Sequence, residues 1–74
     1  MAMVDVKTEI TGNVWKIVTK PGDKVPEDEP LMILESMKME IPVGAPEDGV
    51  VAEILVNEGD TVTEGTVVAR IEVT

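Results

Sequence analysis

The stretch that decides the fold is Gly12–Ser36, with the sequence GNVWKIVTKPGDKVPEDEPLMILES, because the chain repeats it. The second copy, GVVAEILVNEGDTVTEGTVVARIEV, occupies Gly49–Val73 and aligns with the first without a gap at an offset of 37 residues. Self-similarity at a fixed offset indicates one supersecondary unit used twice. A unit this short cannot bury an apolar face alone, so we expect the two copies to pack on each other. The identical pairs are Gly12/Gly49, Val14/Val51, Ile17/Ile54, Gly22/Gly59, Asp23/Asp60, Val25/Val62, Glu27/Glu64 and Glu35/Glu72.

The composition predicts an all-β chain. Thirteen Val, six Ile and seven Thr suit pleated, half-buried strands, while six Gly and five Pro divide the chain into short segments. No stretch has the apolar period of an amphipathic helix, so we expect none. The predicted fold is a flattened barrel-sandwich of two small antiparallel sheets related by an approximate two-fold axis, with residues 1–74 forming one domain. Strands are expected over residues 4–10, 14–19, 31–36, 39–43 and 67–73.

Several positions are expected to define the interior. In both copies the first strand places two apolar residues three positions apart, which predicts a bulge or a strand buried on both faces. Val25 and Val62 are expected to anchor loops to the core. Trp15 aligns with Ala52, and we expect its indole to fill the core, with a partly exposed recognition surface as the alternative. The other expected interior residues are Val67, Ala69, Ile71 and Val73, with Met32 and Leu34 in the first copy.

Charge and residue types narrow the function. Fifteen acidic residues against six basic ones give a net charge of −9 without a basic stripe, so no nucleic acid is expected as a partner. No apolar run is long enough to span a membrane and no cysteine is present, so we expect a cytoplasmic protein. We also expect the chain to be monomeric in isolation. Without His, Cys or Tyr, an independent enzyme is not expected. The acidic run Glu27–Glu29 lacks the ligand spacing of a calcium loop and is expected to be a solvated turn, so no metal site is predicted.

The segment at the junction of the two copies, Glu35–Glu40 (ESMKME), predicts a tight β-hairpin. A two-residue turn at Met37-Lys38 brings the apolar residues of the flanking strands onto one face, and a shift of one residue destroys that match. The expected cross-strand pairs are Ser36/Met39, Leu34/Ile41 and Met32/Val43.

This hairpin breaks two local rules. Tight hairpin turns require positive φ, for which Met37 and Lys38 are poor choices, at a cost of about 1 kcal/mol. The same register places the carboxylates of Glu35 and Glu40 opposite each other, and like charges in that arrangement repel. An exposed lysine alone usually only aids solubility, and methionines alone usually fill a core. Their combination at the junction, in an unfavourable turn, indicates Lys38 as a functional site.

Three motifs resemble the biotinyl domain family, the biotin carboxyl carrier modules of carboxylases. The family's attachment signature is Ala/Ser-Met-Lys-Met preceded by Glu, and it stands here within Glu35–Glu40. The family's Ala-Pro-x-x-Gly-x-Val pattern is Ala45–Val51, and its Gly-Asp-x-Val turns are Gly22–Val25 and Gly59–Val62. The resemblance covers nearly the whole chain. The chain has no space for the protruding insertion found in some carrier domains.

The resemblance implies a non-catalytic carrier. Lys38 would receive biotin as an amide from a biotin protein ligase and shuttle carboxyl-biotin between a biotin carboxylase and a carboxyltransferase. Exposure at the hairpin tip would let the ligase reach the amine. The residues that would be recognised by the ligase are Glu35, Ser36, Met37, Met39 and Glu40.

Two other readings stay open. Lipoyl domains are swinging-arm carriers of related sequence, but they usually place Asp before the lysine and Ala after it. Here both neighbours of Lys38 are Met, which favours biotin. A non-carrier barrel-sandwich module, as in efflux adaptors or assembly proteins, is the second alternative, and such a module has no need of Met-Lys-Met.

Overall fold

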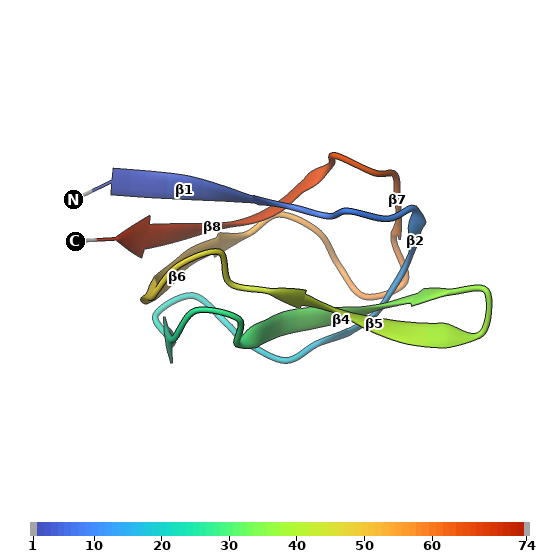
Figure 1. Cartoon of the computed structure of the whole chain (residues 1–74), viewed down its shortest axis with the longest axis horizontal. Helices are drawn as coiled ribbons and strands as arrows, with labels where there is room; N and C mark the ends of the chain where they lie inside the picture. Colours follow the sequence, from blue (N-terminus) through green and yellow to red (C-terminus); the bar gives the residue numbers. More distant parts are fainter. Residues whose placement is uncertain (1, 74) are drawn as a thin grey trace.

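The structure is a computed structural model that describes residues 2–73. Within this range the chain forms eight strands and no helix, so the all-β prediction is confirmed. These residues therefore offer no helix able to cross a membrane. Figure 1 shows how the strands are arranged. The predicted domain, residues 1–74, extends beyond the described range by Met1 and Thr74. The strands are β1 (Ala2–Lys7), β2 (Gly12–Ile17), β3 (Lys24–Val25), β4 (Pro30–Ser36), β5 (Met39–Gly44), β6 (Gly49–Ile54), β7 (Thr61–Val62) and β8 (Val67–Val73).

Two four-stranded antiparallel sheets face each other. One has the strand order β1-β8-β6-β3, and the other has the order β5-β4-β2-β7. The molecule is elongated, with principal extents of 36 × 19 × 18 Å. The β4–β5 hairpin projects at one end of the long axis, while β1 begins and β8 ends at the opposite end (Figure 1). The predicted sandwich of two small sheets is therefore confirmed.

The eight strands form two equivalent sets. Strands β1 to β4 become β5 to β8 when 37 is added to every residue number, and the two sheet orders interconvert under the same operation. This confirms the predicted two-fold relation and extends it to β1 and β5, which share one identical pair, Val6 and Val43. Each sheet takes two strands from each half of the chain. Neither half can therefore complete a sheet alone.

Four bulges occur in two equivalent pairs. Trp15 in β2 and its counterpart Ala52 in β6 are extra residues, because the register moves from Val14↔Leu34 to Lys16↔Ile33 and likewise in the other sheet. The bulge predicted for these strands is confirmed. Leu31 and Val68 are extra residues against β5 and β1. An extra residue lets two neighbours turn toward the same side, so strict alternation fails there.

The bulges correct the predicted interior. Met32, Leu34, Ala69 and Ile71 are fully buried as expected. Leu31 and Val68 are fully buried as well, which strict alternation did not predict, whereas Val67 and Val73 are only half-buried. Val25 and Val62 are each 4% exposed, which confirms them as core anchors.

Trp15 is not a core residue. Its side chain is 48% exposed, so the expectation of a core-filling indole was wrong and the alternative of a partly exposed surface is correct. The physical reason is its place at the bulge, outside an interior already filled by branched aliphatic residues. The equivalent position holds Ala52, so the sandwich does not require a large side chain there. An exposed indole N–H can donate to water and needs no protein acceptor.

Two glycines of the repeat are required for the same steric reason. A Cβ on Gly12 would lie 2.7 Å from the carbonyl oxygen of Glu35, and one on Gly49 would lie 2.5 Å from that of Glu72. Both distances are too short for any side chain, so β2 and β6 can approach β4 and β8 only with glycine at their start. The close approach explains why Gly12 and Gly49 are identical in the two copies.

The first strand ends earlier than expected. The prediction was a strand over residues 4–10, but β1 ends at Lys7. The buried hydroxyl of Thr8 donates to the Ile10 carbonyl oxygen at 3.0 Å and accepts from the Ile10 N–H at 3.2 Å. These local bonds form a turn after Thr8, whose backbone still bonds to Gly65 and Thr66. The strand β1 ends at Lys7 because Lys7 already lies opposite Val67, where β8 begins.

Candidate functional site

The β4–β5 hairpin has the predicted register. A two-residue turn at Met37-Lys38 joins the strands, and all the expected pairs form. Leu34 lies opposite Ile41 with its side chain fully buried, so the inner face of the hairpin is fixed by the core. The observed pairs are Ser36↔Met39, Glu35↔Glu40, Leu34↔Ile41, Ile33↔Pro42 and Met32↔Val43.

The backbone of the turn is left-handed at both central residues. Met37 has a φ of 50° and Lys38 a φ of 66°, and Asp28 is the only other non-glycine residue with positive φ in residues 2–73. This is the geometry that Asn-Gly adopts easily and that other residues adopt at a cost of about 1 kcal/mol or more each. The strain persists because strands with a buried face hold the register.

The turn presents its side chains to solvent. Met37 is 92% exposed and Met39 is 62% exposed, although both are apolar. Lys38 between them is also exposed, and it makes no ion pair or side-chain hydrogen bond with residues 2–73. The turn that carries this amine joins β4 and β5 at one end of the molecule (Figure 1), where another protein can enclose the side chain.

Two carboxylates lie next to the turn. Glu35 and Glu40 are cross-strand partners and both are exposed. On the other side of Glu35 lies Asn13, whose side-chain oxygen accepts a hydrogen bond from the Thr61 hydroxyl at 2.9 Å. Both of these neighbouring groups are neutral, so neither offsets the charge of Glu35. No basic side chain pairs with either carboxylate within residues 2–73. A basic group from a partner would relieve their mutual repulsion.

The structure brings the six predicted site residues, Glu35 to Glu40, together at one end of the molecule. A pocket of about 370 Å³ lies elsewhere, between the edge strands β1 and β5, and Lys38 is not among its lining residues. The tip is therefore a projection for presenting a group and not a cavity for enclosing one. Sequence reasoning favoured a core position for Trp15 of the neighbouring strand and gave its surface position only as the alternative, although its alignment with Ala52 was a signal.

The comparisons with known proteins agree with this architecture. The family profile described as "Biotin-requiring enzyme", of the biotin/lipoyl type, matches residues 1–71. The biotin/lipoyl attachment protein of Bacillus subtilis is 44% identical over 66 residues, which cover 89% of this chain and 90% of that protein. The biotinylated protein TB7.3 homolog of Mycobacterium leprae is 42% identical over 67 residues, covering 90% and 94%.

Solved structures of a carboxylase and of a lipoyl domain match the fold. The urea carboxylase of Kluyveromyces lactis superposes with a TM-score of 0.92 at 39% identity, over 97% of this chain and 6% of that one. The lipoyl domain of the 2-oxoglutarate dehydrogenase complex of Azotobacter vinelandii gives a TM-score of 0.75 at 36% identity, over 93% and 95%. The family match, the full-length relatives and the shared fold together show that the chain is a carrier domain of the biotin/lipoyl attachment family.

Proposed function

We propose that this protein is a biotin carboxyl carrier and that Lys38 is its attachment site. The observation that carries the proposal is the exposed amine between Met37 and Met39 on a strained turn at the end of a rigid sandwich. The names of the two full-length relatives, one a biotin/lipoyl attachment protein and one a biotinylated protein, support it.

The chain's own contribution to attachment is the nucleophile. The neutral Nζ of Lys38 would attack the carbonyl carbon of an activated biotinyl-adenylate held by a biotin protein ligase. The new bond is an amide, the leaving group is AMP, and the amine's proton passes to the ligase or to solvent. Lysine suits this step because its amine is compact and lies on a flexible four-carbon stem.

The rigid sandwich suits a carrier. Biotin, once bound, would supply the transfer of a carboxyl group between a biotin carboxylase and a carboxyltransferase. The chain's residues tether the group at high local concentration and present it at a projecting end. Recognition by the ligase is assigned to the side chains around the amine: Glu35, Ser36, Met37, Met39 and Glu40.

A lipoyl carrier is the second candidate, because a lipoyl domain shares the fold and 36% sequence identity. The flanking residues favour biotin, since both neighbours of Lys38 are Met where lipoyl domains usually have Asp and Ala. The biotinylated relative favours biotin as well. Parallel expression with a lipoate-attaching enzyme distinguishes the two groups.

The attachment site is tested by intact mass spectrometry after co-expression with a biotin protein ligase. We expect one biotinyl group on the parent chain and none on the Lys38→Arg variant, because a guanidinium is not a nucleophile under these conditions. Addition to another lysine in the variant would contradict the assignment of Lys38, and lipoylation of the parent without biotinylation would contradict the choice of cofactor. The other lysines are Lys7, Lys16, Lys20 and Lys24.

A further inference from the structure

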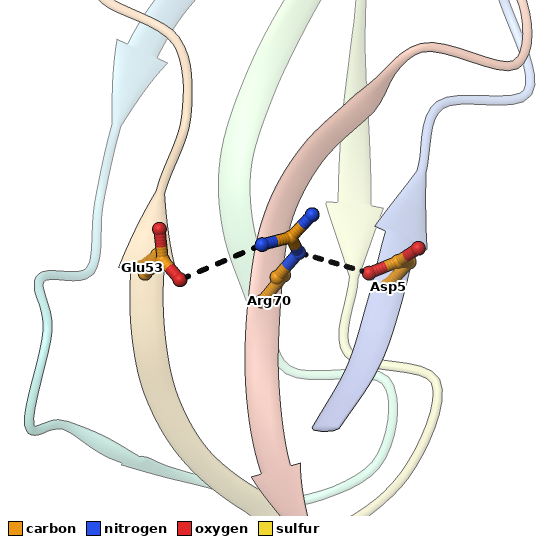
Figure 2. Close-up of polar contacts among 3 residues, drawn as sticks. All are labelled: Asp5, Glu53 and Arg70. Atoms are coloured by element: carbon orange, nitrogen blue, oxygen red, sulfur yellow. Dashed lines mark hydrogen bonds and ion pairs between the residues drawn. The ribbon is translucent and has the colours of Figure 1, made fainter.

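The outer faces of the two sheets differ in chemistry at equivalent positions. On the sheet without the hairpin, Arg70 lies between Asp5 and Glu53, as Figure 2 shows. Its Nε donates to Asp5 Oδ1 at 3.1 Å, and its Nη1 lies 3.7 Å from Glu53 Oε1. The outer face of this sheet therefore carries a row of three paired charges, two negative and one positive.

The equivalent row on the hairpin sheet is largely apolar. Ile33 replaces Arg70, Pro42 replaces Asp5 and Lys16 replaces Glu53 at the offset of 37 residues. Ile33 is half-buried, whereas Pro42 and Lys16 are exposed. The bulge beside this row carries Trp15, 48% exposed, where the other sheet has Ala52. We name Trp15, Lys16, Ile33 and Pro42 the Trp15 patch.

The fold does not require this patch. The other sheet satisfies the same backbone positions with an ion network and a small residue, within the same sandwich. An exposed tryptophan beside apolar neighbours loses free energy in water and regains it when a partner covers it. The patch is therefore best explained by binding.

The patch continues the surface of the hairpin tip. Ile33 precedes Met37 by four residues, so the row lies about 14 Å from the turn at about 3.4 Å per residue. Glu35 and Glu40 share the outer face with Ile33 and Pro42, because members of each pair are two positions apart along one strand. Moving away from the turn, this face presents the two carboxylates and then the Trp15 patch.

We propose that the Trp15 patch is a docking surface for the protein that acylates Lys38, an inference that rests on the proposed function. The partner that fits has an apolar recess for the indole, basic groups for Glu35 and Glu40, and an acidic group near Lys16. A specific interface covers about 800 Å² on each side, about one-sixth of this protein's 4630 Å² surface. The hairpin tip alone is too small for that area, and tryptophan is the residue type most enriched at the energetic centres of interfaces.

The test is steady-state biotinylation with purified biotin protein ligase. Trp15→Ala should raise the KM for the carrier about tenfold with kcat unchanged, because the indole contributes to docking and not to chemistry. Trp15→Phe should raise the KM less than Trp15→Ala does. The matched control is Leu55→Ala, which removes a 42% exposed apolar side chain from the other half of the molecule and should leave KM unchanged.

A second variant copies the ion network onto the hairpin sheet. Lys16→Glu, Ile33→Arg and Pro42→Asp together reproduce the Glu53, Arg70 and Asp5 row, so the far-ultraviolet circular dichroism should match the parent. The KM should rise at least as much as for Trp15→Ala.

Three results would overturn the proposal. They are an unchanged KM for Trp15→Ala, an equal rise for Leu55→Ala, and a dimer of the parent chain in analytical ultracentrifugation that Ile33→Arg abolishes. The last result would assign the patch to self-association. If the parent chain is not biotinylated at all, the proposed function is refuted. If the parent is biotinylated and the patch variants keep its KM, only the docking role of the Trp15 patch is refuted.

Discussion

At the scale of single residues, the hairpin turn accepts a strained backbone at the residues that present the Lys38 amine. Met37 and Lys38 both occupy left-handed backbone, with φ values of 50° and 66°. Lys38 cannot be replaced without losing the amine, but Met37 contributes only its exposed thioether side chain. The strain at Met37 is therefore available for relief by a residue that accepts positive φ.

We expect Met37→Asn to stabilise the protein by about 0.5–1 kcal/mol, because asparagine adopts left-handed backbone more easily than methionine. In a domain of this size that gain corresponds to a rise in Tm of about 2–8 °C. Thermal unfolding followed by circular dichroism measures it. Met39→Asn is the control, because Met39 is exposed at normal φ, and it should leave Tm nearly unchanged. A lower Tm for Met37→Asn would contradict the assignment of strain.

At the scale of the strands, the bulges decide which side chains face the core. Leu31 and Ile33 are two positions apart in β4, so strict alternation would place both on the same face. The bulge at Leu31 turns its side chain inward to full burial, while Ile33 stays half-buried on the outer face. The two residues are therefore a matched pair for measuring what the bulge contributes.

Leu31→Ala should lower the free energy of unfolding by about 2–5 kcal/mol, because it leaves a cavity in a closed core. Ile33→Ala should cost clearly less, since its side chain is partly solvated already. Urea unfolding followed by circular dichroism gives both values. Equal losses for the two variants would show that β4 alternates regularly and that the inward turn at Leu31 is wrong.

At the scale of the whole molecule, two features dominate. The sheets are interleaved, with each taking two strands from each half, so we expect the chain to unfold as one cooperative unit. The net charge of −9 opposes compaction through self-repulsion. The ion pairs of Arg70 are exposed, so each contributes about 0–1 kcal/mol at most.

We expect added NaCl to raise Tm by a few degrees between about 10 and 200 mM, because screening removes more repulsion than it removes ion-pair attraction. Thermal unfolding at constant pH measures the effect. A variant with Glu47→Gln and Glu64→Gln, both exposed positions, should show a smaller salt dependence. A Tm that falls with salt would show that the Arg70 network outweighs the repulsion.

Much of the fold and of the candidate site could be predicted from residues alone. The hairpin register followed from the side chains of Met32 and Leu34, which had to share a buried face with Val43 and Ile41. The paired sheets followed from the repeat, and the bulge in β2 from the spacing of its apolar residues. Whether the Trp15 side chain is buried or exposed could not be decided from the sequence, because a residue at a bulge can face either side of the sheet and only the packing of the core settles which.

The sequence by itself determined the duplicated strands and the turn at Met37-Lys38 with its lysine, because the period of apolar residues and the hairpin register are local properties of the chain. Only the tertiary structure decided that the sheets interleave, that Leu31 and Val68 turn inward, and that Trp15 lies outside on the face leading to Lys38. Those outcomes depend on how distant strands share a closed interior, and no local stretch of residues encodes that competition for space.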